Sequence, residues 1–520
     1  MFDRQPALKS LLKSQWTYII LFAVLGLIGV LNHSMWRDEM NVWLIAKYSE
    51  NLSDFLTNIH YDRGHPGLWH ILVAISFHLV DNPIAMQILH WSIGLSAIIL
   101  LWLFSPFTQR QKILFSFGYL PFHENLLISR NYGLGMLLLF AICTVFASRN
   151  KTYLGLSCLL VLLANSNIYG LLIGFALALT LAIELCCDSN RRKSFFRQSK
   201  SKLFALGDIL VSAIVIAVGF IVSAYTIFPP VQVATESVLT EISADSNLER
   251  FLISLGRMLG GYTLLIPNPD RLLDLAVCGV ISLIFFYIFA TNFIKKPLVL
   301  FFFVFSTLEL LIFSYVSFPG RGPRHFGHFY FILIAALWLA NNFKNQNISL
   351  SKFKFLSQAR LKKTQAFAFM LVLYIQFFAG LFGFTSDLII PYSAGKQVAN
   401  YLKENNLQDN FIIASRDVNM ASISGYLGKE LYYAERDDFG SYSLFLRQER
   451  KGMNHTKVLE KTAKLFDNNQ TNIAISERIL LILYKELKES HPDLKITPIE
   501  KFERAWKDSE RYYLYAIERK

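Results

Sequence analysis

The sequence predicts a mainly α-helical, polytopic membrane protein with a soluble α/β domain at its C-terminal end. Of its 520 residues, 53% are hydrophobic and only 17% are charged, and the mean hydropathy is +0.37. This composition excludes an ordinary soluble enzyme. Apolar runs near the roughly 20 residues that cross a bilayer recur between residues 16 and 389.

The composition changes at residue 391, after which charged residues are frequent and no long apolar run remains. A segment of this length is close to the usual size of a single domain. We therefore expect a membrane module over residues 1–390, whose outer loop 32–66 carries an acidic pair, and an extracytoplasmic α/β domain over residues 391–520.

The positive charge of the chain predicts its orientation in the membrane. The formal net charge is +13, but the basic residues are concentrated in short segments beside apolar runs, at 4–13, 191–202 and 344–363. This is the positive-inside pattern of a membrane protein and not a nucleic-acid footprint. We expect all three segments in the cytoplasm, the N-terminus with them, in a multi-pass protein of the plasma (inner) membrane.

The number of spans follows from parity. Seven apolar stretches separate the first two basic segments, near residues 16–33, 66–80, 84–105, 113–128, 131–148, 152–166 and 168–187. Seven spans would put the second basic segment outside. The stretch 67–80 is short and carries His70 and His78, so we expect it at the outer interface. The stretch 251–266 contains Arg257 and several glycines, so we also expect it at the outer interface. About eleven spans then remain.

An acidic pair, Asp38 and Glu39, follows the first span and lies between Trp36 and Trp43. A carboxylate at this surface can take the proton of a hydroxyl or amine that attacks an activated sugar carbon. Partial burial would raise its pKa toward a useful range. An acid pair with tryptophan anchors in the aromatic belt of the membrane explains the same residues equally well.

Residues 60–70 combine histidines and charges just before an apolar helix, which we expect to begin at Pro66 because the first helical position needs no backbone donor. The favoured interpretation is that these histidines form hydrogen bonds or position a substrate. A metal cluster of His60, His65 and His70 is less favoured, since the spacing matches no standard site.

Arginines also fall on the predicted outer face. Arg130 lies in an outer hairpin between two spans, where a lone arginine commonly extends to the interface but can instead hold a lipid phosphate through bidentate hydrogen bonds. The same two roles, extending to the interface or binding a phosphate, are open to Arg321, Arg324 and His325. The positive-inside bias disfavours cations on this side, which adds weight to a functional role.

The order of these motifs resembles that of the GT-C glycosyltransferases. An Asp-Glu pair follows the first helix, a His-Pro-x-Leu motif starts the next, and Arg-x-Tyr follows the fourth apolar stretch. The pattern is most similar to protein O-mannosyltransferases and their bacterial relatives, including aminoarabinose transferases that modify lipid A and Rgt-type lipopolysaccharide glycosyltransferases. The resemblance covers roughly residues 16–390. It implies a polyprenyl-phosphate-linked sugar donor and transfer on the outer face.

The resemblance also implies roles for individual residues. Asp38 is similar to the catalytic base and Glu39 to its acidic neighbour, so both are expected catalytic residues. The residues expected to line the substrate cavity are Asp62, His65, Pro66, His123, Glu124 and Tyr132. Those expected to bind the donor phosphate are Arg130, Arg321, Arg324 and His325.

In this family the reaction is a direct displacement that inverts the sugar and releases polyprenyl phosphate, which outer cations stabilise. The expected partners are the lipid-linked sugar, an envelope acceptor (lipid, polysaccharide or protein) and membrane lipid, without nucleic acid. No metal is required if arginines neutralise the phosphate, although Asp38 and Glu39 could hold a divalent ion.

Two other functions remain open, a transporter or flippase and a non-catalytic scaffold for envelope assembly. The transporter is less favoured because the polar clusters gather at one face and no internal repeat is evident.

The C-terminal segment alternates two kinds of pattern. We expect helices at 394–404, 457–466 and 477–488, and strands at 411–414, 427–434, 473–475 and 512–516. The segment contains no glycine-rich phosphate loop, nucleophile elbow or metal motif, and its acidic stretch 434–440 is expected to be a solvated loop.

Overall fold

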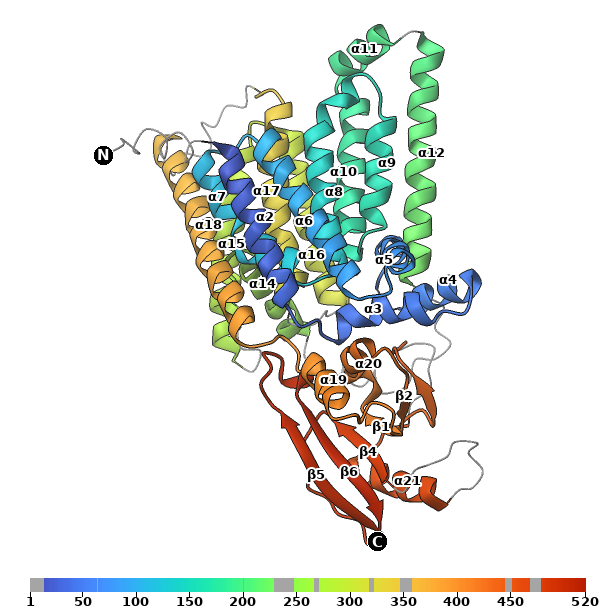
Figure 1. Ribbon diagram of the computed structural model, residues 1–520. Helices are drawn as coiled ribbons and strands as arrows, with labels where there is room; N and C mark the ends of the chain where they lie inside the picture. The colour runs from blue at the N-terminus through green and yellow to red at the C-terminus, as the bar shows by residue number, and fades with distance from the viewer. Residues whose placement is uncertain are drawn as a thin grey trace, which may run out of the picture.

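The computed structural model describes residues 14–62, 64–199, 201–228, 247–265, 271–317, 322–346, 358–444, 451–467 and 478–520. Long helices form a bundle, and a small sheet domain lies at one end of it (Figure 1). This arrangement confirms the predicted fold class, a helical membrane protein with a C-terminal α/β domain.

Within the described ranges, eight helical segments are long and apolar enough to cross a membrane. They belong to α2 (Gln15–Asn32), α6 (Ile84–Phe104), α8 (Asn131–Val145) with η2 (Phe146–Asn150), α10 (Ile168–Cys187), α12 (Lys202–Ile227), α15 (Leu272–Ala290) with η3 (Thr291–Phe293), α16 (Pro297–Ser317) and α18 (Gln358–Ile389).

The three other predicted spans correspond to shorter or interrupted helices. Two are α9 (Leu154–Ala164) and α17 (Pro323–Leu339). The third, at 113–128, divides into α7 (Gln109–Ser116) and a π-helix, η1 (Tyr119–Leu127). Pro121 in η1 has no backbone N–H to donate, which helps to explain the irregular winding there. The total of eleven spans therefore stays a prediction.

Three short helices lie crosswise at the end of the bundle that faces the sheet domain (Figure 1). They are α3 (Arg37–Tyr48), α4 (Leu52–Tyr61) and α5 (Leu68–Leu79). At 12 residues, α5 is too short to span, as expected for the interfacial stretch. The prediction that Pro66 begins this helix is wrong by two residues, because Gly67 occupies the N-cap position and its carbonyl accepts the N–H of Ile71.

The other demoted stretch, 251–266, falls largely in α14 (Asn247–Thr263), whose second half is buried inside the protein and does not lie on its surface. Gly261 permits this, since a Cβ atom there would lie 2.3 Å from the backbone oxygen of Phe326 in α17. The level of this helix relative to the membrane interface stays a prediction.

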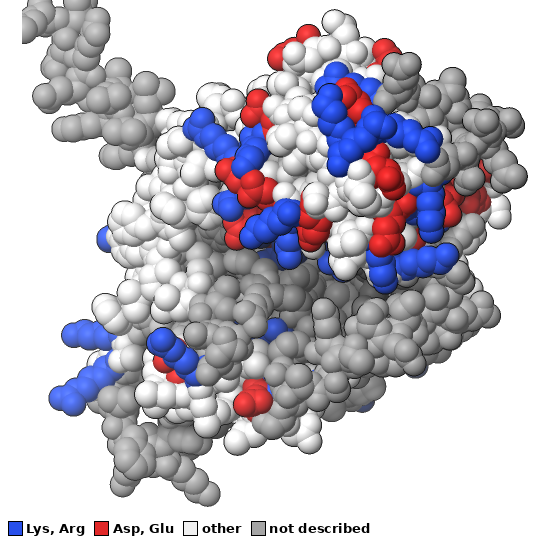
Figure 2. Space-filling view, turned by 90° about the horizontal axis from the view of Figure 1, so that it is seen from below, with Lys and Arg blue, Asp and Glu red and all other residues white. Residues whose placement is uncertain are grey.

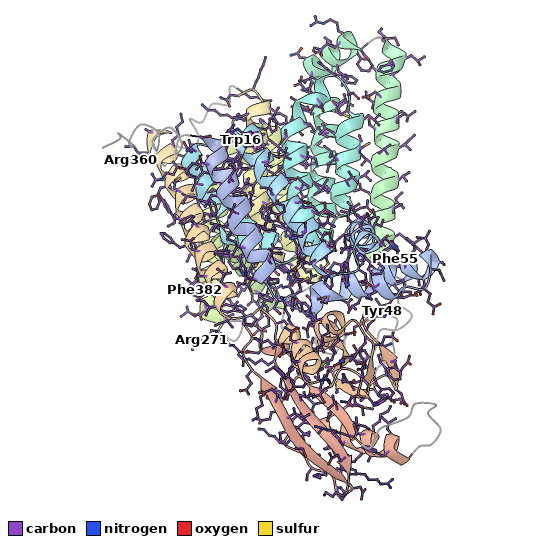
Figure 3. All side chains as sticks on the ribbon, viewed as in Figure 1. Trp16, Tyr48, Phe55, Arg271, Arg360 and Phe382 are labelled. Atoms are coloured by element: carbon purple, nitrogen blue, oxygen red, sulfur yellow. The ribbon has the colours of Figure 1, made fainter. Side chains whose placement is uncertain are left out.

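The two ends of the bundle carry different residues, as expected from the predicted topology. Trp16 in α2 and Arg360 in α18 lie at the end of the bundle far from the sheet domain, whereas Phe382 lies near that domain (Figure 3). The basic helix α11 (Ser189–Gln198) is also at the far end (Figure 1). The structure thus gives the predicted basic segments that it describes a common end, while the side of the membrane that each end faces stays a prediction.

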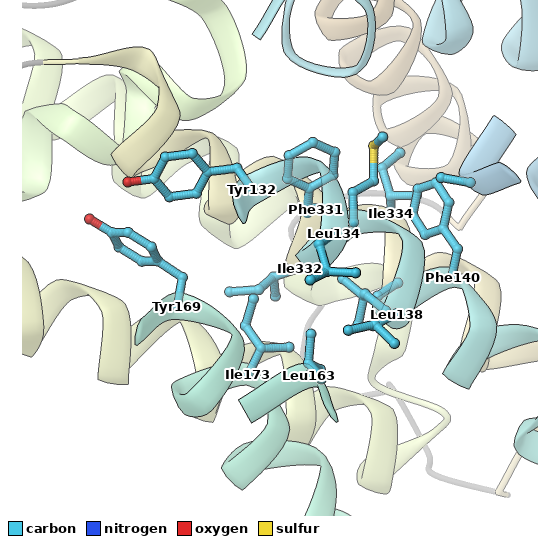
Figure 4. Close-up of a cluster of buried hydrophobic side chains, with 14 of the residues drawn as sticks. Tyr132, Leu134, Leu138, Phe140, Leu163, Tyr169, Ile173, Phe331, Ile332 and Ile334 are labelled. Carbon is cyan, nitrogen blue, oxygen red and sulfur yellow. The ribbon is translucent and has the colours of Figure 1, made fainter. Parts of the chain in front are cut away.

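Buried side chains of α8, α10 and α17 pack tightly behind the end that carries the polar residues. Tyr132 and Tyr169 lie next to each other with ring centroids 6.3 Å apart, above a layer that includes Ile173 and Ile332 (Figure 4). Close packing of this kind leaves little room for adjustment. The polar residues of this end therefore rest on a rigid base.

The C-terminal domain follows α18 and contains a sheet of six strands in the order β3-β2-β1-β4-β6-β5. The strands are β1 (Ile412–Ser415), β2 (Leu431–Tyr433), β3 (Asp438–Gly440), β4 (Arg478–Leu483), β5 (Leu494–Phe502) and β6 (Tyr512–Arg519). Strand β1 pairs in parallel with β2 and β4, and the other pairs are antiparallel. The helices of this domain are α19 (Gly395–Glu404), α20 (Ala421–Leu427) and α21 (His455–Asp467).

The structure confirms the helices predicted at 394–404 and 457–466 and the strands at 411–414 and 512–516. The strand predicted at 427–434 is confirmed only for Leu431–Tyr433, because α20 extends to Leu427. The helix predicted at 477–488 is wrong. Its apolar core is the central strand β4, in which every residue after Arg478 is buried, and a strand covered on both faces shows no alternation. The strand predicted at 473–475 lies outside the described residues.

The surface of the molecule seen from the side of the C-terminal domain carries charges of both signs. Lys and Arg are interspersed with Asp and Glu on this face (Figure 2). A mixed surface of this kind is typical of a solvated domain.

Candidate active site

The acidic pair lies in the first turn of α3, immediately after α2 ends. A helix N-terminus favours negative charge there, because its backbone N–H groups are unpaired. Glu39 uses this position, since its Oε2 accepts a hydrogen bond from the backbone N–H of Trp36 at 3.2 Å. The turn between α2 and α3 therefore holds both carboxylates at the end of the bundle.

Three arginines surround the carboxylate of Asp38. Its Oδ2 atom accepts a short hydrogen bond from Nη1 of Arg130 and lies 3.5 Å from Nη2 of Arg324. Its Oδ1 atom lies 3.6 Å from Nε of Arg37. Burial alone would raise the pKa of Asp38, but the three guanidinium groups lower that pKa to about 2. The side chain stays 29% exposed, so an incoming group can reach it.

Arg130 is held from several directions. It is the N-cap residue of α8, and its carbonyl oxygen is 2.8 Å from Nε2 of His90. Its guanidinium group packs over the ring of Tyr132 at 5.6 Å, and its Nη2 donates to Nε2 of His65 at 3.0 Å. The two ends of the predicted Arg-x-Tyr motif therefore act together, with the aromatic ring supporting the cation.

His65 lies between Arg130 and Asp62. Arginine can only donate, so Nε2 of His65 accepts, which leaves this ring neutral. Burial lowers the pKa of His65 to about 4, with Arg130 adding to the effect and Asp62 opposing it. Asp62 lies 3.4 Å from Nδ1 of His65 and accepts a hydrogen bond from Nε2 of His70 at 2.9 Å. Pro66, next in the chain, is buried.

Arg324 and His325 come from the start of α17. Arg324 lies over the ring of Trp36 at 5.1 Å. His325 faces inward, where its Nδ1 is 3.0 Å from the hydroxyl of Tyr169 and its ring meets the edge of Tyr132. Arg324 therefore reaches Asp38, while His325 supports the cluster from behind. Arg321 lies outside the described residues.

Glu39 is fully buried and its oxygens are occupied by protein groups. Its Oε1 accepts from the backbone N–H of Ser129 at 2.6 Å, and its Oε2 is 2.9 Å from Nε2 of His33. The other ring nitrogen of His33 is 2.8 Å from Asp387 in α18. Burial alone would lower the pKa of His33, but the neighbouring Asp387 and Glu39 raise that pKa well above its ordinary value, so His33 is a buried cation between two acids. This geometry gives Glu39 a positioning function, since it fixes α3 beside the residue that precedes Arg130.

The C-terminal domain contributes charges that the sequence motifs did not reveal. Nζ of Lys507 lies 5.4 Å from the ring centres of both Trp36 and Tyr392. Oε1 of Glu510 lies 3.8 Å from Nε of Arg37. Glu510 is fully buried, and burial raises its pKa to about 7 although Arg37 opposes this. No local pattern marks these residues, and only the tertiary fold brings them to α3.

His123 and Glu124 belong to η1 and lie to one side of the arginines. Glu124 accepts a hydrogen bond from the hydroxyl of Tyr119 at 3.2 Å, and the ring of Tyr119 stacks on His123 at 4.9 Å. The ring of His123 lies 6.4 Å from that of Tyr392, which separates it from Trp36. Asp387, on the same side, was missed although an acid inside an apolar span is itself a functional signal.

No group of three or more His, Cys, Asp and Glu side chains among the described residues has an arrangement that could hold a metal ion. The histidines considered as a cluster are divided, since His60 stacks on Tyr225 while His65 and His70 both face Asp62. Asp38 faces the arginines, whereas Glu39 faces His33 and the backbone N–H of Ser129.

Comparisons with known proteins bear on the fold. No family model matches the chain, and no curated protein matches it in sequence. The chain is similar to the crystal structure of ArnT from Cupriavidus metallidurans bound to undecaprenyl phosphate, with a TM-score of 0.50 and 9% identity over 96% of this chain and 97% of that one. The apo structure of the same protein gives a TM-score of 0.49 and 10% identity over the same shares. The chain thus shares the fold of the ArnT structure bound to undecaprenyl phosphate.

Proposed function

We propose that this protein is a membrane glycosyltransferase that moves a sugar from a polyprenyl-phosphate donor to an envelope acceptor at the outer face of the membrane. The observation that carries the proposal is the convergence of Arg130 and Arg324, from two different helices, on the single carboxylate of Asp38. Guanidinium groups bind phosphate through paired hydrogen bonds, so the same two residues can hold the donor. ArnT, whose fold the chain shares, has been crystallised with undecaprenyl phosphate.

The donor phosphate would take the place of Asp38 between the arginines. A carboxylate with a pKa of about 2 is a weak base, because its cations stabilise the ionised form. Once the phosphate pairs with Arg130 and Arg324, this stabilisation falls and the pKa of Asp38 rises. Asp38 then becomes a stronger base only when the donor is bound.

The reaction that follows is a single displacement. A hydroxyl oxygen of the acceptor attacks the anomeric carbon and forms the new glycosidic bond while its proton passes to Asp38. The bond between that carbon and the phosphate oxygen breaks, and its electron pair remains on the departing polyprenyl phosphate. Arg130 and Arg324 stabilise the charge that develops there, with Lys507 nearby. Attack opposite the leaving group inverts the anomeric carbon.

The proposal assigns the neutralising charge to arginines, so it requires no metal ion. Glu39 has its oxygens bonded to His33 and to the backbone at Trp36 and Ser129, which leaves it unsuited to share a divalent ion with Asp38. Full activity in the presence of a strong chelator is the expected result.

Two substitutions test the assignment. Asp38→Asn should insert normally and abolish the glycan product in cells, while undecaprenyl phosphate should bind the purified protein more tightly because the competing carboxylate charge is gone. Arg130→Gln should weaken that binding by about tenfold or more, which corresponds to about 1.4 kcal/mol. Mass analysis of glycans and polyprenyl-phosphate sugars supplies the first readout and binding in nanodiscs the second.

Asp81→Asn is the matched control, because Asp81 is an exposed acid paired only with Lys47 among the described residues. It should change neither measurement. An unchanged glycan product in cells carrying Asp38→Asn would contradict the catalytic role, and would favour a transporter or a scaffold.

A further inference from the structure

A pocket of about 480 Å³ lies at the end of the bundle far from the sheet domain. Its lining comes from the start of α11, the loop before α16 and the segment that follows η4 (Ala340–Asn342). Helix α11 marks this end in Figure 1, whereas α3, which carries Asp38, lies at the opposite end. The volume is within the range of small-molecule sites, roughly 300–1,000 Å³. The pocket is therefore separate from the candidate active site.

An ion pair closes the buried side of this pocket. Glu184, which lines it, accepts hydrogen bonds from Nε and Nη2 of Arg149 at 2.8 and 3.2 Å. Arg149 is 1% exposed, and its guanidinium group lies 4.0 Å from the ring centre of Phe146 and 4.9 Å from that of Phe343. Nε of Arg191 lies 3.2 Å from the same carboxylate. Two guanidinium groups thus share one carboxylate, which leaves an excess of positive charge.

The two lysines of the lining have no acidic partner among the residues that the structure describes. Nζ of Lys296 donates to the carbonyl oxygen of Ala340, and partial burial lowers the pKa of Lys296. Lys344 is exposed. The other acid of the lining, Asp188, is the N-cap of α11, where its side chain accepts the backbone N–H of Arg191 at 3.0 Å. A bound anion would balance these cations.

The groups around the pocket suit a phosphate in particular. Arg191 presents a guanidinium group on a side chain that is 16% exposed, and guanidinium and ammonium groups are common protein ligands of phosphate. Pro297 and Leu298 also line the pocket and begin α16, a helix of 21 residues. The start of a helix carries backbone N–H groups without intrahelical partners, which favour an anion. The cations and the helix start together select a phosphate-bearing ligand.

An apolar face of α16 leads away from the pocket and points to a phosphate carried by lipid. Leu298 in the lining, Phe301 and Phe305 recur at helical spacing, so they share this face. The rings of Phe301 and Phe305 stack at 5.2 Å, and the ring of Phe305 lies 6.3 Å from that of Phe175 in α10. Phe175 is 46% exposed, which places this face on the outside of the bundle. A headgroup in the pocket can therefore keep an acyl chain along α16 in the bilayer.

Two of the basic segments that the sequence predicts in the cytoplasm meet at this pocket, since Arg191 belongs to one and Lys344 to another. Basic pockets between membrane helices on the cytoplasmic side bind the headgroups of anionic lipids. We propose that this pocket binds the phosphate headgroup of an anionic phospholipid from the leaflet at that end of the bundle. The site does not depend on the proposed transfer reaction. A soluble phosphate is the other source of the same chemistry, which experiment must separate from the lipid.

Removal of the two lysines tests the site in the full-length protein. Lys296→Gln with Lys344→Gln removes two cations of the lining. Lys151→Gln with Lys193→Gln is the matched control, because it removes two exposed cations at the same end that are not part of the lining. Native mass spectrometry of the delipidated protein gives the Kd for phosphatidylglycerol, which should rise about tenfold or more in the first protein and less than about twofold in the second. An equal rise in both would overturn the proposal, because binding would then follow net charge alone.

Two competitors identify the source of the phosphate. Phosphatidylcholine, whose headgroup has no net charge, should bind the unchanged protein about tenfold more weakly than phosphatidylglycerol. Excess inorganic phosphate should leave the phosphatidylglycerol complex in place, because it lacks the acyl chains that pack along α16. Equal binding of the two lipids, or displacement of the lipid by inorganic phosphate, would contradict a site for an anionic phospholipid.

A second pair of variants fills the pocket and keeps its charges. Ser194→Phe places a ring in the lining, whereas Ser189→Phe changes a residue of the same helix outside it. The Kd for phosphatidylglycerol should rise about tenfold in Ser194→Phe and stay within about twofold in Ser189→Phe. The melting temperature of the lipid-free protein shows whether each variant is folded, and the lysine pair provides the test if Ser194→Phe is not. An unchanged Kd in folded Ser194→Phe protein would rule out this pocket as the lipid site.

Discussion

At the scale of single residues, the proposed base and the proposed phosphate ligands are bound to each other in the free protein. Arg130 and Arg324 satisfy Asp38, and Asp38 satisfies them. In the proposed mechanism, neither function is available until the donor phosphate enters and exchanges these partners. On this mechanism the donor binds first, and the acceptor meets an active base only afterwards, which limits wasteful attack by water.

Glu510 gives this cluster a dependence on pH. Burial raises its pKa from the ordinary value of 4.5 to about 7, so the folded protein keeps the proton over a range in which the unfolded chain has lost it. Stability should therefore be greatest below pH 4.5 as far as this group is concerned, and should fall as pH rises to 7. The loss is about 3 kcal/mol, since each tenfold change in an equilibrium constant corresponds to about 1.4 kcal/mol.

Thermal unfolding of the purified protein between pH 5 and pH 8 measures this effect. Glu510→Gln should reduce the fall in melting temperature over that range, because the amide cannot ionise. Glu404→Gln, at an exposed position, is the control and should follow the unchanged protein. Equal pH dependence in all three proteins would show that Glu510 does not titrate in this range.

Sequence reasoning identified the residues that local motifs mark and missed those that only the fold assembles. The structure brings Asp38, His65 and Arg130 together with Arg324 in one cluster. Each of them could be predicted because it is a polar residue beside an apolar helix, and the sequence shows this directly. Lys507 and Glu510 lie in a charged domain in which many residues look alike. Their proximity to α3 depends on how that domain packs, and no spacing encodes it.

At the scale of elements, the crossing of α18 over η1 positions one side of the site. A Cβ atom on Gly380 would lie 2.2 Å from the carbonyl oxygen of Phe117 and less than 3 Å from the next backbone atoms. Backbone cannot move aside as the end of a flexible side chain can. The helices can therefore approach this closely only with glycine at position 380.

Gly380→Ala should lower the free energy of unfolding by about 1–3 kcal/mol, the usual effect of overpacking, and should reduce transfer activity because η1, which carries His123 and Glu124, is displaced from α18. Gly207→Ala is the matched control, since a Cβ atom there meets nothing within 4 Å. It should be neutral or stabilise by up to about 1 kcal/mol through the better helix propensity of alanine. Unfolding in detergent with both variants measures the difference. Equal stability of the two would contradict the close crossing.

The sequence predicted the type of an element well where only one of its faces is buried, and poorly where both faces are buried. The alternating and amphipathic patterns of α19 and α21 gave their helices, but β4 is apolar on both faces and was mistaken for a helix. Segment length was then the remaining guide to whether this segment forms a helix or a strand. Its apolar run continues into polar residues that a helix also tolerates, so the segment was long enough for a helix. Similarly, hydropathy alone could not show that 113–128 is divided into α7 and η1.

At the scale of the whole molecule, the cluster lies where the bundle and the C-terminal domain meet. Helices α3, α8 and α17 supply one side, and the segment around Lys507 and Glu510 supplies the other. The domain is thus part of the site and not only an appendage to it. Hydropathy and charge predicted the helical bundle, the end of the bundle that carries the polar residues, and the C-terminal domain. These features could be predicted because they depend on composition over long segments.

Cysteine labelling checks the predicted orientation. In a background with the five native cysteines replaced, Glu404→Cys in α19 should react with an impermeant maleimide in intact spheroplasts. Lys193→Cys in α11 should react only after permeabilisation, because the basic segment faces the cytoplasm. Both positions are exposed, so access depends on sidedness. The reverse pattern would invert the topology and place the site in the cytoplasm.

The link between His33 and Asp387 joins residues 354 positions apart, and that between Arg37 and Glu510 spans even more of the chain. A ribosome delivers the N-terminal partner of each link long before the other. During insertion the nascent chain therefore lacks both links. A chain that stops before residue 510 leaves Arg37 without Glu510, and one that stops before residue 387 also leaves His33 without Asp387, defects that favour its removal by proteases.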